Sequence, residues 1–356
     1  MQKVSFVVTA HNDEKEIGKC LETLRNLKGE YQIIIIDDGS TDNTLDICKR
    51  TAESDHRFLV ISQENQGVSV ARNVGINKCT GDWLFFIDGD DYIIPDIIEK
   101  EIIPRLDTSC DIVYFMNGRL LGKELIEPKH INHTSVRLEG QDIQELQCKI
   151  FNKNHNGIDF SGVAFATPWG KAYRTEFIKE NGFEFLPGII RKQDALFNLQ
   201  ISTKVQSVII IPFVGYIYRQ RGGRTYEYNT ELMKSDVRLL HIVETIVNRI
   251  DKEEVRKCYY AFLGEHILTM IRLEFCNSTN PYSYKKRKDM FCDYICKEPM
   301  CRLLQKKKRE SGVSFDQAIV LFFVKHRLFI LLDIYYRSKL FSKMGLKVLY
   351  HWQVSK

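Results

Sequence analysis

The feature that most constrains the fold is a continuous β-branched run, Gln32–Ile36, within an alternation of strand-like and helix-like segments over the first 115 residues. An apolar run without polar alternation is typical of a strand buried on both faces. Repeated strand–helix–strand units predict a mainly parallel sheet flanked by helices. The other expected strands are Val4–Thr9, Phe58–Ser62, Trp83–Ile87 and Asp111–Phe115, and the expected helices are Glu14–Leu27, Thr41–Ser54, Gly67–Lys78 and one that starts at Pro95.

The rest of the chain is first irregular and then helical. One helix is expected near Asp142–Phe151, and another over Phe197–Val208. A strand over Val208–Ile211 is expected to stop at Pro212, which cannot donate a ladder hydrogen bond. We therefore expect three parts: residues 1–115, residues 116–230, and a helical extension over residues 231–356.

Polar side chains follow each of the first four expected strands. The carboxyl ends of parallel strands meet at one edge of a sheet, where ligands bind. Four polar segments at equivalent positions therefore predict a single site. The segments are Thr9-Ala10-His11-Asn12-Asp13, Asp37–Asp42, Gln63–Gly67 and Asp88–Asp91.

Asp88-Gly89-Asp90 is the sharpest of these segments. Two carboxylates that flank a glycine at a tight turn suit a hard divalent cation such as magnesium or manganese. The alternative is a turn with capping aspartates. The position after a hydrophobic strand, beside three other polar segments, favours the metal, with Asp90 and Asp88 as ligands.

The second and third segments suit a nucleotide. Asp38 ends a strand, where its carboxylate could accept a hydrogen bond from a base or ribose, while Ser40–Asp42 has the composition of a helix cap. Asn65 and Gly67 precede a helix start, which favours anions. Arg72 either faces the diphosphate or base, or is a surface arginine that packs over the sheet edge.

The order of these motifs resembles the family-2 inverting glycosyltransferases with the GT-A fold, over roughly residues 1–225. The resemblance implies a Rossmann-like mixed, mainly parallel α/β sheet, with donor binding in residues 1–115 and acceptor binding in residues 116–230. It implies that the uridine pocket is lined by Thr9, Ala10, His11 and Asp38, that Asn12 belongs to the same motif, that Asp88 touches the ribose, and that Asp90 coordinates the metal. Many relatives carry Pro-x-Tyr-Asn where this chain has Thr9-Ala10-His11-Asn12.

Three later segments also resemble family motifs. Arg191–Phe197 resembles a Glu-Asp-x-x-Phe segment with Gln193 in place of Glu, which makes Asp194 the general base; otherwise Asp194 is a helix N-terminal acid. Trp169–Tyr173 resembles a Trp-x-Lys-x-Tyr segment. In it, Trp169 either stacks on a sugar or fills the core, and Lys171 is expected to contact acceptor or phosphate. Tyr218–Arg224 resembles a loop near the phosphates, so Arg221 is either a diphosphate contact or a solvated charge.

Charge is unevenly distributed along the chain. Residues 285–356 contain 17 Lys/Arg against 6 Asp/Glu, whereas residues 1–284 are net acidic. Ile319–Val324 and Leu328–Leu332 are each far shorter than the roughly 20 apolar residues of a spanning helix. With the cations they suit a helix lying in a membrane interface, or a helical cap with a solvated basic face. No nucleic-acid-binding motif accompanies the charge.

The leading hypothesis is a non-processive inverting transferase at the inner face of the plasma membrane. The cysteines suit reduced cytosolic thiols, and the N-terminal run is too short for a secretory signal. The expected donor is a nucleotide-sugar, UDP-linked, and the acceptor a glycan or lipid-linked glycan of a bacterial surface polysaccharide. Two alternatives remain: a sugar nucleotidyltransferase, and a nucleotide-sugar-binding module that has lost catalysis.

Overall fold

The computed structural model describes residues 2–128, 134–152, 155, 162–220, 228–305 and 315–337. The chain divides into two compact units, residues 1–150 with 156–223, and residues 151–155 with 224–356. The expected boundary at residue 115 lies inside a strand of the first unit, so the two expected halves share one sheet.

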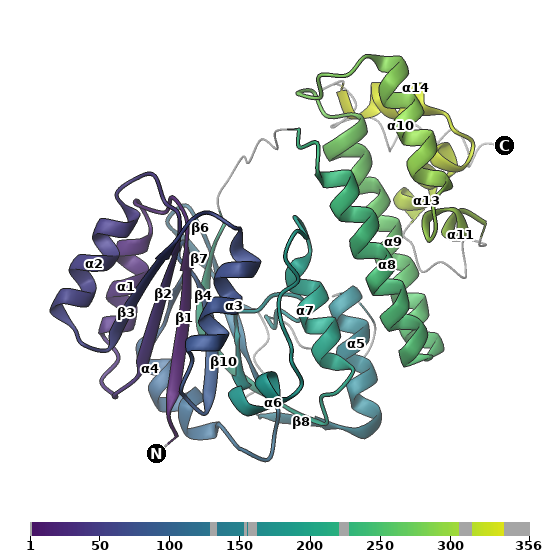
Figure 1. Cartoon of the computed structure of the whole chain (residues 1–356). Helices are drawn as coiled ribbons and strands as arrows, with labels where there is room; N and C mark the ends of the chain where they lie inside the picture. The colour runs from purple at the N-terminus through teal and green to yellow at the C-terminus, as the bar shows by residue number, and fades with distance from the viewer. Residues whose placement is uncertain are drawn as a thin grey trace. The chain divides into compact units, whose positions relative to one another are not determined.

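The first unit is a mixed α/β sheet with flanking helices (Figure 1). Its strands are β1 (Val4–Ala10), β2 (Gln32–Asp38), β3 (Phe58–Gln63), β4 (Trp83–Asp88), β5 (Tyr92–Ile93), β6 (Ile112–Leu121), β7 (Glu124–Ile126), β8 (Val136–Glu139), β9 (Lys171–Arg174) and β10 (Ser207–Gln220). Its α-helices are α1 (Ile17–Arg25), α2 (Thr44–Ser54), α3 (Val68–Lys78), α4 (Pro95–Ile97), α5 (Ile143–Phe151), α6 (Thr175–Glu180) and α7 (Gln193–Ser202). A π-helical turn at Ile98–Ile102 and 3-10 turns at Ile103–Arg105 and Gly140–Asp142 complete it.

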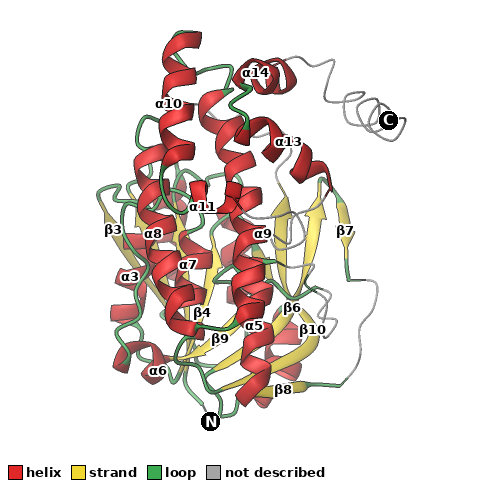
Figure 2. Ribbon diagram, turned by 90° about the vertical axis from the view of Figure 1, so that its right-hand side faces the viewer, coloured by secondary structure: helices red, strands yellow, loops and turns green. Residues whose placement is uncertain are grey.

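The strand order is β3-β2-β1-β4-β9-β6-β10-β5. The neighbours β3, β2, β1 and β4 are all parallel, as the β-branched runs predicted. Strand β9 is antiparallel to both β4 and β6, while β10 runs parallel to β6. In Figure 2, β3 lies at one lateral end of this sheet and β7 lies toward the other. The predicted mixed, mainly parallel sheet is confirmed.

Helices cover both faces of the parallel strands. In Figure 1, α1 and α2 lie on one side of β1–β3 and α3 lies on the other. Helix α3 packs closely because it carries Gly75, where a Cβ would come 2.2 Å from Cγ1 of Val7. The close packing brings the N-terminus of α3 to the carboxyl edge of the sheet, where the predicted site lies.

The sequence predictions misplaced the end of one strand and the start of one helix. Strand β10 does not stop at Pro212 but continues to Gln220, with register shifts between Ile211 and Tyr216. A bulge allows the strand to pass a residue that has no N–H. Helix α7 begins at Gln193 rather than Phe197, so Asp194 lies in its first turn.

The second unit is helical. It contains α8 (Leu232–Ile250), α9 (Glu253–Met270), a π-helical turn (Ile271–Phe275), α10 (Tyr284–Cys296), α11 (Met300–Gln305), α13 (Phe315–Lys325) and α14 (Phe329–Arg337). Among the helices that the structure describes, none combines the length and apolar composition needed to cross a bilayer. Four of the cations counted in residues 285–356, Lys306–Arg309, lie outside the described residues.

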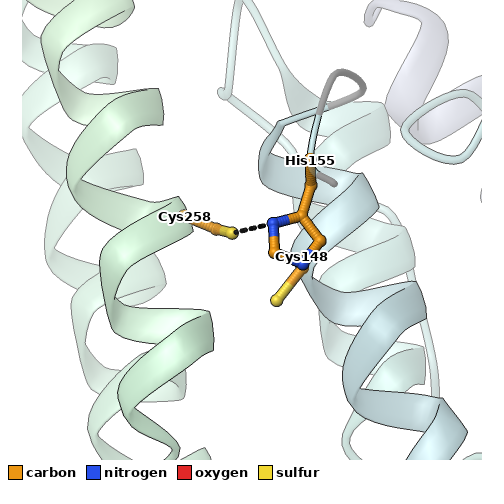
Figure 3. A group of neighbouring side chains, drawn as sticks. All are labelled: Cys148, His155 and Cys258. Carbon is orange, nitrogen blue, oxygen red and sulfur yellow. Dashed lines mark hydrogen bonds between the residues drawn. The ribbon is translucent and has the colours of Figure 1, made fainter. Parts of the chain in front are cut away.

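Polar contacts are buried inside the second unit. Asp236 on α8 accepts a hydrogen bond from the hydroxyl of Tyr294 at 2.7 Å and contacts His266 on α9. Sγ of Cys258 on α9 lies 3.3 Å from Nδ1 of His155, a hydrogen bond that Figure 3 shows. Burial raises the pKa of Glu274, whose side chain has no exposed surface, to about 7.

Candidate active site

The loops that follow β1 and β2 are joined by hydrogen bonds. Nδ1 of His11 lies 2.8 Å from the backbone oxygen of Asp38. The backbone N–H of Asn12 donates to Oγ of Ser40 at 3.0 Å, and Oδ1 of Asn12 accepts from the N–H of Thr41 at 2.8 Å. Asn12 adopts a left-handed conformation with φ 54°, which asparagine tolerates better than most residues. These contacts fix the first two polar segments against each other.

The loop between β3 and α3 joins them through Asp38. Its carboxylate accepts from the backbone N–H groups of Gln66 and Gly67 at 2.9 and 2.8 Å, and from Nε2 of Gln63 at 2.8 Å. A carboxylate has about four acceptor positions, so this geometry leaves room for one more donor. Nδ2 of Asn65 lies 3.2 Å from Nε2 of His11, which places three of the predicted donor-site residues together.

The acidic turn after β4 packs against the end of β1. Gly89 donates its N–H to the oxygen of Thr9 at 2.8 Å, and a Cβ on Gly89 would lie 3.0 Å from that oxygen and 3.1 Å from Cβ of Ala10. A side chain here would push the turn away from β1. This contact explains why a glycine separates the two aspartates, and it brings the fourth polar segment to the first.

Asp91 fixes the same turn to β10. Its carboxylate accepts from the hydroxyl of Tyr216 at 2.6 Å and from the N–H of Arg219 at 2.7 Å, while the Tyr216 hydroxyl accepts from the N–H of Asp88 at 3.3 Å. Burial, reinforced by Asp88 and Asp90, raises the pKa of Asp91 to about 8. Sequence reasoning did not assign Asp91 a role, since its partners are about 125 residues away in the chain.

The acidic turn has a donor set suited to a hard cation. Asp88, Asp90 and Asp91 each present a carboxylate oxygen within 4.8 Å of the others. Because Asp91 is fully buried and engaged by β10, Asp88 and Asp90 are the better ligands. Oxygen donors at this spacing fit magnesium or manganese.

Arg72 links this turn to the second part of the unit. From the first half of α3, its guanidinium donates to Asp88 at 2.8 Å and to Asp194 at 2.5 Å. The side chain is 3% exposed and lies over the ring of Phe185 at 5.1 Å. Arg72 is therefore not a surface arginine. One planar group fixes two carboxylates that are 106 positions apart in the sequence.

The pKa of the Asp194 carboxyl is subject to opposing effects. Burial raises its pKa, whereas the positive charges of Arg72 and Lys171 lower it; the net result is a raised pKa. The side chain is 26% exposed, so Asp194 is not completely enclosed. A partly exposed carboxylate of raised pKa is a candidate for a general base.

Trp169 and Lys171 have structural roles in this conformation. The Trp169 indole is 7% exposed and lies parallel to the ring of Tyr216, with centroids 4.8 Å apart, which favours the core interpretation. Lys171 is fully buried, and its ammonium donates to the oxygens of Ala164 and Thr167. The predicted contact of Lys171 with acceptor or phosphate is therefore wrong for this conformation. Burial lowers its pKa.

Asn198 connects the same loop to α7. Its Nδ2 donates to the oxygen of Thr167 at 3.0 Å and to that of Asp194 at 2.8 Å, and its Oδ1 accepts from the hydroxyl of Tyr173 at 3.1 Å. The contact fixes the first turn of α7 and hence the position of Asp194. Periodicity marks Asn198 only as an interior helix residue, so no sequence signal identified it.

A second connection fixes Phe185 beneath Arg72. The side chain of Asn73 donates to the oxygen of Phe185 and accepts from its N–H, both at 2.8 Å. The structure thus brings together the predicted residues at the ends of β1, β2 and β4, on α3, and in α7. Arg221 lies outside the described residues.

Comparison with known proteins agrees with this geometry. The model of glycosyl transferase family 2 matches residues 5–182. The chain is 27% identical over 332 residues to the putative glycosyltransferase EpsH of Bacillus subtilis, an alignment that covers 91% of this chain and 92% of the relative. It is 26% identical over 290 residues to glycosyltransferase GlyG of Streptococcus pneumoniae, covering 78% and 87%. A crystal structure of S. aureus TarS in complex with UDP-GlcNAc has a similar fold, with TM-score 0.62, 18% identity and coverage of 94% and 91%.

Proposed function

Since the chain belongs to glycosyl transferase family 2 and is a glycosyltransferase, we propose that it transfers one sugar from a UDP-sugar to a hydroxyl of a glycan or lipid-linked acceptor in bacterial surface polysaccharide synthesis. We propose an inverting, non-processive reaction. The observation that supports this best is the guanidinium of Arg72, which bonds both Asp88 of the acidic turn and Asp194 of α7.

The proposed donor site is the edge formed by the first three polar segments. His11 lies within hydrogen-bonding distance of both Asp38 and Asn65, and the N–H of Gly67 at the start of α3 bonds the Asp38 carboxylate on the same edge. A base would contact Thr9–Asn12 and Asp38, and a diphosphate would lie toward the helix start and Arg72. The structure of similar fold in complex with UDP-GlcNAc supports uracil as the base.

The proposed cofactor is magnesium or manganese, coordinated by Asp90 and Asp88. A divalent cation there would stabilise negative charge on the leaving diphosphate. Arg72 already neutralises part of the charge of Asp88, so the turn is not left with uncompensated carboxylates.

The reaction proceeds by direct displacement. Asp194 accepts the proton of the acceptor hydroxyl, and the oxygen forms a bond to the anomeric carbon from the face opposite the diphosphate. The bond between that carbon and the diphosphate oxygen breaks, and its electron pair leaves with the nucleoside diphosphate. Arg72 helps Asp194 remain ionised despite burial, because a nearby cation favours the charged carboxylate.

Replacement Asp194→Asn tests the assignment. We expect transfer to fall by about 10²–10⁴-fold, the usual contribution of general acid–base catalysis, while donor affinity changes little. Asp96→Asn is the matched control, because Asp96 lies in the first turn of α4 and is exposed. Transfer by chromatographic product analysis and donor affinity by calorimetry are the measurements. Unchanged transfer by Asp194→Asn would exclude the general-base role.

The two alternatives predict different products. A sugar nucleotidyltransferase would release pyrophosphate when it forms a nucleotide-sugar, whereas the proposed transferase releases UDP. A binding module would bind the donor and release neither. The wild-type protein is incubated with metal ions and either nucleotide-sugars plus acceptor, or UTP plus sugar 1-phosphates. Release of UDP in the first mixture, of pyrophosphate in the second, or of neither separates the three.

We also propose a cytoplasmic site of action at the inner face of the plasma membrane. A lipid-linked acceptor would be available there, and a UDP-sugar is a soluble cytosolic donor. The composition of the second unit supports peripheral attachment, since it combines short apolar helices with excess cations.

A further inference from the structure

The helices α13 and α14 carry apolar side chains on their exposed faces. Ile330, Leu331 and Ile334 on α14 are 56%, 42% and 46% exposed, and Phe322 on α13 is 51% exposed. These are high values for large apolar side chains that lie so close together in the sequence. Isolated exposed residues are ordinary, but four on one helical pair need an explanation.

The exposed face of α14 is opposite its packed face. Phe329 and Leu332 are buried, and Asp333 is bonded to Arg287 of α10 at 2.6 and 3.0 Å. At 100° per residue, Ile330, Leu331 and Ile334 point away from these positions. The packed face is therefore occupied by the unit's own core, and the exposed face is a separate surface.

Basic side chains lie next to these apolar side chains in the sequence. Lys325, the last residue of α13, and His326 and Arg327 in the connection to α14 are all exposed. The single acidic residue of positions 320–334 is Asp333, which Arg287 neutralises. We call the set the α13–α14 surface, made of Phe322, Lys325, His326, Arg327, Ile330, Leu331 and Ile334.

We propose that the α13–α14 surface binds the interface of an anionic lipid bilayer. Apolar side chains would enter the boundary between headgroups and acyl chains, and Lys325 and Arg327 would contact anionic headgroups. A soluble polyanion would satisfy the cations but give Ile330 and Leu331 no favourable environment. The combination of both side-chain types selects the lipid surface.

Helix length agrees with this mode of binding. The two helices are 11 and 9 residues long, which suits a position in the plane of the interface rather than across the bilayer. Exposed Lys285, Lys286 and Lys288 on α10 add positive charge to the same unit. The inference rests on the proposed site of action at the membrane and names the surface that would attach there, but it does not depend on the donor or on Asp194.

Vesicle sedimentation of the full chain tests the proposal without any donor. The probes are sucrose-loaded vesicles of phosphatidylglycerol and phosphatidylcholine, and vesicles of phosphatidylcholine alone. We expect the wild-type protein to bind the anionic vesicles preferentially, and raised salt to weaken binding. The double variants Ile330→Ser with Leu331→Ser, and Lys325→Gln with Arg327→Gln, should each lower the partition coefficient about tenfold.

Leu59→Ser is the matched control. Leu59 is 45% exposed and lies on edge strand β3 of the first unit. The substitution therefore removes a comparable exposed apolar side chain outside the α13–α14 surface. It should bind vesicles as the wild type does. Circular dichroism and thermal unfolding of every variant establish that each is folded.

Three results would overturn the proposal. If the Ile330→Ser, Leu331→Ser variant bound vesicles as the wild type does, the apolar side chains would have no role. The cations alone would then account for binding, as they would for binding to a soluble polyanion. Equal binding to neutral vesicles would remove the role of the cations. Self-association that those two substitutions abolish, in a protein that does not bind vesicles, would identify a second copy of the chain as the occupant.

Discussion

At the scale of the residue, the site depends on a few side chains whose partners are distant in sequence. Arg72 bonds Asp88 and Asp194, and Asp91 bonds Tyr216. Sequence patterns placed Arg72, Asp88 and Asp194 among the candidates. The pairing that joins them could not be read from local spacing, because it depends on how α7 packs against the sheet.

Gly39 should not tolerate a side chain. It has φ +70°, and a Cβ would come 2.6 Å from the backbone nitrogen of Asn65. We expect Gly39→Ala to cost about 2 kcal/mol or more of unfolding free energy and to weaken donor binding, because the loops after β2 and β3 must separate. Urea denaturation and donor calorimetry measure the two effects.

Gly182→Ala is the control for Gly39. Gly182 also has positive φ, +63°, but a Cβ there would meet no atom within 4 Å. Backbone strain should lower the unfolding free energy of Gly182→Ala by about 1 kcal/mol, and donor affinity should not change. Equal donor affinity in both variants would contradict the proposed role of the contact between the two loops.

The pH dependence of transfer should report the charge of Arg72. Burial raises the pKa of Asp194, and Arg72 opposes the rise. Because a general base acts only when ionised, the rate should increase with pH through a pKa above the ordinary carboxyl range. Arg72→Met should move this acidic limb to higher pH, and Arg72→Lys should move it less. The measurement is kcat at saturating donor between about pH 4 and 9. An unmoved limb in Arg72→Met would contradict the electrostatic role.

At the scale of the element, the position of α7 is set by hydrogen bonds to its first turn. Asn198 joins α7 to the loop before β9, and the buried ammonium of Lys171 donates to two backbone oxygens of the same loop. Buried polar groups of this kind stabilise one arrangement because any other leaves them without partners.

Asn198→Asp should displace this helix start. The change removes the N–H donor to the oxygens of Thr167 and Asp194 and puts negative charge beside them. We expect a loss of about 2–3 kcal/mol of unfolding free energy, and at least a tenfold fall in kcat where the protein remains folded. Thr203→Asp adds the same charge at the exposed C-cap of α7 and should retain most activity. Similar loss of activity in both variants would show that charge on the helix, rather than the Asn198 contacts, matters.

At the scale of the whole molecule, the two units have different chemistry. The sheet unit contains the acidic turn and the proposed base, and the helical unit contains buried polar groups and a cationic, apolar surface. Their stabilities should respond differently to pH, because the ionisable groups in their interiors differ.

Glu274 should make the helical unit less stable as pH rises. Its pKa is raised to about 7 from an ordinary value of 4.5, so the folded form retains the proton over a range in which the unfolded form has lost it. The stabilisation is complete below about pH 4.5, decreases through pH 7, and amounts to about 3 kcal/mol. We expect Glu274→Gln to remove part of the decrease in Tm between about pH 5 and 8, while the raised pKa of Asp91 in the sheet unit accounts for a further part.

Glu265→Gln is the control, because Glu265 is on the exposed face of α9 and should leave the pH dependence of Tm as in the wild type. Thermal unfolding by circular dichroism across that pH range measures the difference. A wild-type slope in the Glu274→Gln protein would contradict the assignment.

Local sequence patterns were sufficient to predict the parallel strands β1–β4, the helices between them and the edge at which their polar ends meet. These follow from periodicity and strand-end composition, which act over a few neighbouring residues. Only the tertiary structure decided that β9 enters the sheet antiparallel, that β10 continues past Pro212, and that Lys171 is buried rather than presented to a ligand. The physical reason is that side-chain burial and ion pairing depend on contacts between segments about 100 residues apart, which local patterns do not contain.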